Sequence, residues 1–265
     1  MILILVSTPR SGSVAFLRYM ESRANFDILH EPLVKLYSSQ YLKGNDVVDQ
    51  YFDQNKGFKS FQELKSVILE YIKTGRNLFI KEMCWSALTY FQSEPDLLAN
   101  DNIKFLIMAR QPEPCLVSFY KALNVSSSQT ITEILGPLRL VFKFLSDFIS
   151  LLKTVKKDFK LIKTEDLILN TQPTIADICA SLDLPFNPEH LQWKSKSETF
   201  DAYQQWKEPK YTPQIWHWHY NALKSQTIDS QIMVNGQISS VKEEHKQEFL
   251  SLLEENRPYY QQLIA

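Results

Sequence analysis

The stretch that decides the fold is Ile2-Leu3-Ile4-Leu5-Val6, followed at once by Ser7-Thr8-Pro9-Arg10-Ser11-Gly12-Ser13. The first five residues form an aliphatic run that is too short for a helix, which predicts a strand buried on both faces. Residues 13–22 carry apolar side chains at helical spacing, so residues 7–12 form the turn between a strand and a helix. The N-terminus of such a helix presents free amides and the positive end of the helix dipole, which suits an anion.

Two residues of this turn favour an anion site. Gly12 is one of only six glycines in the chain, and Arg10 offers a charged fork for phosphate or sulfate oxygens. The turn is not a Walker A loop, because the GxxxxGK[ST] spacing is absent and its lysine is replaced. A Ser/Gly turn that only caps the helix, with an exposed arginine, is the alternative that the turn alone leaves open.

The rest of the chain alternates strands and helices, which predicts an α/β fold: a mostly parallel sheet with helices on both faces, in three layers. Further strands are predicted at 26–29, 77–81, 103–109 and 159–162. Helices are predicted at 33–41, 61–73, 113–124, 132–156, 174–182 and 242–263. Residues 187–240 show weak periodicity and many aromatic residues, so we expect an irregular C-terminal region near the rim of a site. In such sheets, ligands bind at the carboxyl ends of the strands.

Composition excludes several classes of protein. The 265 residues carry a net charge of −1, with 44% hydrophobic and 22% charged residues, so we expect one globular domain over 1–265. No apolar run is long enough to span a bilayer, and no signal peptide is recognisable, so we expect a cytoplasmic protein. A pI near 6.5 gives no support for a nucleic-acid partner. The three cysteines (Cys84, Cys115 and Cys179) show no metal-binding spacing, and we expect no metal.

A second candidate motif follows the predicted strand 103–109. Arg110 ends that strand, Pro112 comes two residues later, and Ser118 comes eight residues later on the following helix. Both polar side chains are expected in the same crevice as the first turn, where a cation and a hydroxyl would suit a second phosphate. A strand-terminal arginine is also often a surface residue or an ion-pair partner, so this motif alone leaves that alternative open.

Together the two segments resemble the sulfotransferase family that uses 3′-phosphoadenosine 5′-phosphosulfate (PAPS). The resemblance implies a P-loop-type fold, PAPS as co-substrate without a metal, and adenosine 3′,5′-bisphosphate as product. By it, the first loop cradles the 5′-phosphosulfate through Pro9, Arg10, Ser11, Gly12, Ser13 and Val14. Val14 stands where many members carry a second threonine. Arg110 and Ser118, at the family's spacing, would hold the 3′-phosphate.

Two further segments lie where the family keeps catalytic groups. His30-Glu31-Pro32 looks like the Glu-Pro segment of the carbohydrate, tyrosylprotein and bacterial branches, which makes Glu31 the candidate general base. Lys81-Glu82-Met83 resembles their Lys-Asp-Pro segment, so Lys81 would neutralise charge in the transition state. Glu82 and Met83 depart from that pattern. Glu31 could instead cap a helix, Lys81 could be a surface lysine, and His30 could compete for the base role.

The expected function is therefore transfer of a sulfuryl group from PAPS to a hydroxyl of an unidentified acceptor, with Glu31, Arg10 and Lys81 as catalytic residues. The alternatives are a catalytically silent nucleotide-binding protein and an atypical P-loop kinase. The aromatic cluster 216–220 (Trp-His-Trp-His-Tyr) is expected to serve packing, adenine stacking or an acceptor wall.

Overall fold

The computed structural model describes residues 1–41, 57–122, 130–132, 139–193, 225–228 and 236–265. Its centre is a sheet of five parallel strands in the order β2-β3-β1-β4-β5. The strands are β1 (Ile2–Ser7), β2 (Asp27–His30), β3 (Leu78–Met83), β4 (Ile103–Ala109) and β5 (Phe159–Lys163). All five were predicted, with ends that differ by at most two residues.

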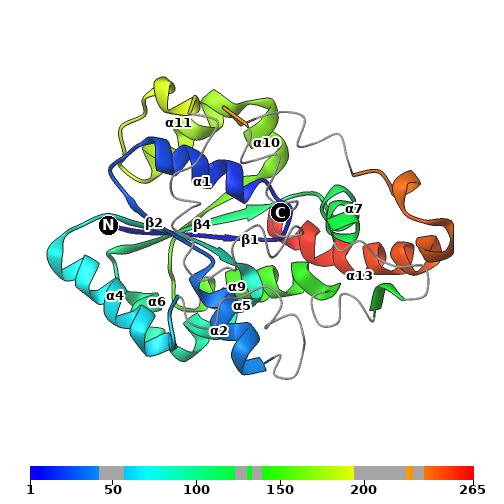
Figure 1. Cartoon of the computed structure of the whole chain (residues 1–265), viewed down its shortest axis with the longest axis horizontal. Helices are drawn as coiled ribbons and strands as arrows, with labels where there is room; N and C mark the ends of the chain where they lie inside the picture. Colours follow the sequence, from blue (N-terminus) through cyan, green and yellow to red (C-terminus); the bar gives the residue numbers. More distant parts are fainter. Residues whose placement is uncertain (42–56, 123–129, 133–138, 194–224, 229–235) are drawn as a thin grey trace.

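Helices cover both faces of this sheet (Figure 1). One face is covered by α1 (Ser13–Ser22), α10 (Thr164–Leu169) and α11 (Thr171–Ser181). The other is covered by α2 (Pro32–Tyr41), α4 (Phe61–Thr74), α5 (Cys84–Ser93), α6 (Pro95–Ala99), α7 (Pro112–Ala122), α9 (Val141–Thr154) and α13 (Lys246–Ile264). The predicted three-layer α/β fold is therefore confirmed.

The strand β1 shows why its sequence is a continuous aliphatic run. Ile2, Ile4 and Val6 belong to the core beneath α5 and α9, whereas Leu3 and Leu5 belong to the core beneath α1 and α11. All five side chains are at most 1% exposed. Alternate residues of a strand face opposite sides, so a strand covered by helices on both sides must be apolar at every position.

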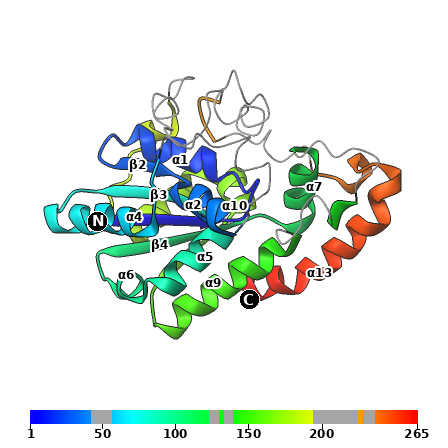
Figure 2. The same cartoon turned by 60° about the horizontal axis from the view of Figure 1, so that its bottom comes forward.

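Two predicted helices begin three or four residues from their predicted start, and a third is interrupted. The helix predicted at 132–156 is not one continuous α-helix: Thr132 is helical, residues 139–140 form a 3-10 turn and α9 covers Val141–Thr154, while residues 133–138 lie outside the described residues. The helix predicted from 174 begins earlier, at Thr171, and the helix predicted from 242 begins later, at Lys246. Figure 2 shows α13 lying along α9, so the C-terminal helix completes the lower layer. Short 3-10 turns precede α13 at Ile238–Ser240 and Glu243–His245.

Candidate active site

The first loop makes a tight turn through left-handed backbone. Gly12 has φ 80° and caps α1, and Arg10 has φ 58° although it carries a side chain. Two hydrogen bonds hold the loop. Within the loop, Ser11 Oγ donates to the Thr8 carbonyl at 2.8 Å, and from α7, Cys115 Sγ donates to the Pro9 carbonyl at 3.0 Å. A strained backbone that its surroundings fix in place is common at functional sites. The loop is therefore a preformed structure at the N-terminus of α1, where the helix dipole favours an anion.

The structure brings the two predicted anion-binding motifs together at Arg10. The Arg10 Nε donates to Ser118 Oγ at 3.0 Å, and the Arg110 guanidinium donates to the Arg10 carbonyl at 3.2 Å. Ser118 comes from α7 and Arg110 follows β4, so both reach the first loop from the neighbouring strand-helix unit. This contact places a hydroxyl and two guanidinium groups in one region, as the motif spacing predicted.

Positive charge is concentrated in this region. Burial and the charge of Arg110 lower the pKa of Arg10, because both disfavour its protonated form. Burial likewise lowers the pKa of Arg110, whose side chain is only 2% exposed. Bringing two guanidinium groups together inside a protein costs free energy that a bound dianion would recover. The electrostatics therefore favour a phosphate or a sulfate here.

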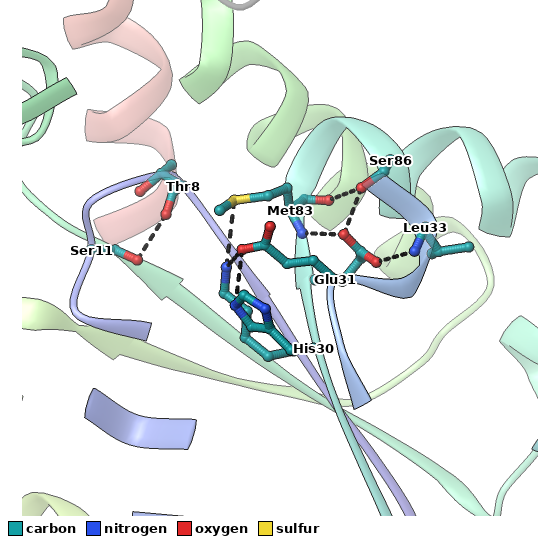
Figure 3. Close-up of polar contacts among 9 residues, drawn as sticks. Thr8, Ser11, His30, Glu31, Leu33, Met83 and Ser86 are labelled. Carbon is teal, nitrogen blue, oxygen red and sulfur yellow. Dashed lines mark hydrogen bonds and ion pairs between the residues drawn. The ribbon is translucent and has the colours of Figure 1, made fainter. Parts of the chain in front are cut away.

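The second pair of predicted residues also meets. Lys81 Nζ forms an ion pair with Glu31 Oε1, and His30 Nε2 lies 3.2 Å from the same oxygen (Figure 3). All three side chains are buried, and Glu31 has φ 50°, in the left-handed region. Burial lowers the pKa of His30, so its ring is neutral near pH 7. The ion pair with Lys81 holds the Glu31 carboxylate in place at this position.

Sheet order explains how these residues meet. In the parallel register His30 is paired with Lys81, and Lys81 with Leu5, so their side chains point to the same face of the sheet, the face that α1 covers. Glu31 follows β2 directly, and the first loop follows β1. The His30–Glu31–Lys81 group and the first loop therefore lie at the carboxyl ends of adjacent strands, where ligands bind in such folds.

Glu82 has a role that sequence analysis treated only as a departure from a motif. Its carboxylate accepts from the backbone amides of Leu33 and Met83, both at 2.7 Å, and from Ser86 Oγ at 2.8 Å (Figure 3). It thus joins the N-terminal turns of α2 and α5. Burial and the nearby Glu31 carboxylate raise the pKa of Glu82 to about 8, although its hydrogen bonds act in the opposite direction.

The remaining sequence predictions concern the first loop, the aromatic cluster, a metal site and a membrane span. Pro9, Ser13 and Val14 are buried in the first loop and the first turn of α1. The aromatic cluster 216–220 lies outside the described residues. Among the described side chains, no group of three or more His, Cys, Asp or Glu residues could hold a metal ion. Across the same part of the chain, none of the helices has the length and apolarity needed to cross a membrane.

Comparison with known proteins identifies the family. The profile of the sulfotransferase domain matches residues 2–230. The chain belongs to the sulfotransferase family. This assignment supports sulfuryl transfer as the class of reaction, and it confirms the resemblance found in the two motifs and the P-loop-type fold. No curated protein shows a significant match.

Solved structures of sulfotransferases resemble this one over most of the chain. The sulfotransferase domain from the curacin biosynthetic pathway is 18% identical, with a TM-score of 0.51 over 96% of this chain and 97% of that chain. The sulfotransferase domain from the Synechococcus PCC 7002 olefin synthase is 15% identical, with a TM-score of 0.49 over 96% and 93%. Mouse sulfotransferase SULT7A1 complexed with PAP is 15% identical, with a TM-score of 0.47 over 95% and 82%. The first of these likenesses supports the fold of this sulfotransferase.

Proposed function

We propose that this sulfotransferase uses PAPS as donor and transfers its sulfuryl group to a hydroxyl of an acceptor. The observation that carries the proposal is the meeting of Arg110 and Ser118 with Arg10, because it brings candidate phosphate-binding groups from two strand-helix units together. A donor with phosphate at both the 3′ and 5′ positions needs two such groups of donors. A nucleotide with a single phosphorylated end uses only one of them.

The binding roles follow from the positions of the residues. The N-terminus of α1, with Ser11, Gly12 and Ser13, would hold the 5′-phosphosulfate through backbone amides and the helix dipole. Arg110 and Ser118 would hold the 3′-phosphate. Arg10 lies between the two motifs and would contact the charge that leaves with the phosphate.

The chemical step needs no metal in this scheme. The acceptor oxygen would attack sulfur in line, forming a new S–O bond while the bond between sulfur and the 5′-phosphate oxygen breaks. The acceptor proton would pass to Glu31, and the electron pair would leave with adenosine 3′,5′-bisphosphate. Lys81 and Arg10 would stabilise charge on the sulfuryl and bridging oxygens, which is where charge changes most in such transfers.

The test is a binding comparison without magnesium. Adenosine 3′,5′-bisphosphate at about 100 times its dissociation constant should stabilise the protein by about 2.7 kcal/mol, which raises the melting temperature by roughly 5–10 °C. ADP at the same concentration should give a much smaller shift. Equal shifts, or a preference for magnesium-ATP, would overturn the proposal and favour a kinase.

Turnover separates an enzyme from a catalytically silent binder. Incubation with PAPS and a panel of hydroxyl acceptors should release adenosine 3′,5′-bisphosphate at a rate that depends on the acceptor. Binding of the bisphosphate together with no release above the rate of PAPS hydrolysis in any acceptor mixture would favour the silent-binder alternative.

A further inference from the structure

Thr164 contacts both anion-binding motifs, although it belongs to neither. It begins α10, directly after β5, and its side chain is fully buried. Its hydroxyl oxygen lies 2.6 Å from the carbonyl oxygen of Ser11 and 3.1 Å from that of Ala109. One hydroxyl group therefore joins the first loop to the end of β4, next to Arg110.

The methyl group of Thr164 lies on the side of Gly12 where a Cβ would stand. A Cβ built on Gly12 would lie 3.7 Å from Thr164 Cγ2. The hydroxyl group of Thr164 thus contacts the Ser11 carbonyl, and its methyl group lies near Gly12. Substitution by valine removes the hydroxyl group and keeps a methyl group there, and substitution by serine does the reverse.

Glu165, the next residue, contacts the chain on the C-terminal side of Arg110. Its Oε1 accepts from the backbone amide of Gln111 at 3.0 Å, and its charge acts on the Arg110 guanidinium. Thr164 and Glu165 therefore hold Ala109 and Gln111, the two residues that flank Arg110 in sequence. Neither side chain caps its own helix, because these hydrogen bonds run to other elements.

We propose that Thr164 and Glu165 are positioning residues that fix the separation between the two anion-binding arginines, Arg10 and Arg110. This inference rests on the proposed function. It holds that the β5–α10 junction determines the selectivity for a nucleotide with phosphates at both its 3′ and 5′ ends. A ligand held at two points requires both points at the correct spacing, and displacement of about 1 Å costs much of the benefit. A ligand held at one point does not need the spacing.

The test measures the affinities of each variant for adenosine 3′,5′-bisphosphate and for ADP by calorimetry. Thr164→Val should weaken bisphosphate binding by about tenfold and ADP binding little, so the selectivity falls by about tenfold, the usual effect of one lost hydrogen bond of this kind. Thr164→Ser keeps the hydroxyl and should keep the selectivity. Thr174→Val is the matched control, because the Thr174 hydroxyl donates to the Asp166 carbonyl away from both motifs.

A second pair of variants tests the same inference should Thr164→Val fail to fold. Glu165→Gln and Glu165→Met both remove the charge, but only Gln keeps an oxygen that accepts from Gln111. Selectivity should therefore fall in the Met variant relative to the Gln variant.

The outcomes separate the two proposals. Suppose that the wild type prefers the bisphosphate. If Thr164→Val keeps that preference in full, this inference alone is overturned. Glu165→Met decides the same question if Thr164→Val does not fold. An equal loss of affinity for the bisphosphate and for ADP would also overturn this inference, because a general loss of structure lowers both affinities and leaves their ratio unchanged. A wild-type protein without any preference would overturn the proposed function, and this inference with it.

Discussion

Arg10 and Ser118 are 108 residues apart in sequence, and the guanidinium Nε of the first donates to the hydroxyl of the second at 3.0 Å. The bond fixes the Arg10 side chain against α7, so the guanidinium stays beside Arg110 instead of extending into solvent. This contact brings the two candidate anion-binding motifs together. The predictions below test what each group contributes to binding and to chemistry.

Ser118→Ala should weaken the binding of adenosine 3′,5′-bisphosphate by roughly tenfold. The substitution removes the acceptor of the Arg10 Nε–H and a hydroxyl donor for the ligand, and hydrogen bonds to charged groups contribute about 1.5–3 kcal/mol. Calorimetry measures the change. Ser150→Ala is the control, because the Ser150 hydroxyl donates to a carbonyl within the exposed face of α9. Equal affinity for wild type and Ser118→Ala would remove Ser118 from the site.

Arg110→Ala should abolish most of the preference for the bisphosphate over ADP. The guanidinium is the cation that the 3′-phosphate would contact, and ADP lacks this phosphate. Thermal shifts for the two nucleotides give the comparison, with Arg257→Ala as control because that arginine is half exposed on α13. Retention of the preference in Arg110→Ala would mean that the 3′-phosphate binds elsewhere.

Arg10→Ala should impair binding and turnover together, because the charge of Arg10 would act on both the bound donor and the transition state. Arg10→Lys keeps the charge but lacks the planar fork and the Nε–H, so it should recover only part of either quantity. Steady-state kinetics with varied PAPS separates kcat from KM. An unchanged bisphosphate affinity in Arg10→Ala would contradict this role.

Glu31→Gln should lower turnover by about 10²-fold or more, the usual contribution of a general base, while bisphosphate affinity changes little. The structure adds a consequence for stability. Lys81 would lose the carboxylate with which it forms a buried ion pair, which costs about 3–5 kcal/mol. Denaturant unfolding measures this loss, and activity is compared well below the unfolding transition.

The double variant Glu31→Gln with Lys81→Met separates the two effects. It removes both members of the buried ion pair, so it should be more stable than Glu31→Gln alone. Turnover should stay low, because the base is still missing. Near wild-type turnover in Glu31→Gln would instead make Glu31 a structural residue.

Glu82→Gln should remove a loss of stability that occurs in the wild type as pH rises from about 5 to about 8. The pKa of Glu82 in the folded protein is about 8, above its ordinary 4.5, so between these pH values the folded state binds more protons than the unfolded state. This group therefore makes the wild type less stable as pH rises from about 5 to about 8. His30 acts with the opposite sign, because burial lowers its pKa.

The difference between wild type and Glu82→Gln isolates the contribution of Glu82, since His30 is present in both. Melting temperatures at several pH values between 5 and 8 provide the measurement. A variant whose melting temperature falls with pH as steeply as that of the wild type would show that Glu82 does not titrate in this range.

Sequence reasoning did well where local patterns carry the information. Short runs rich in apolar residues predicted all five strands, and in β1, which helices cover on both faces, residues 2–6 are all apolar. It missed α5 for a related reason: this helix is buried on nearly every side, so its sequence has no polar face and no helical period. It also missed α10, a helix of six residues that is too short to show a period.

The sequence by itself singled out the candidate residues, because the first loop, Glu31 and Arg110 follow predicted strands, Lys81 ends one, and Ser118 lies on the helix after Arg110. The tertiary structure alone decided which of them meet. In the order β2-β3-β1-β4-β5, β3 lies beside β2, so Lys81 reaches Glu31, and β4 lies beside β1, so Arg110 reaches the first loop. The roles of Glu82 and Thr164 also required the structure, because their partners are backbone groups of other segments, which leave no pattern in the sequence.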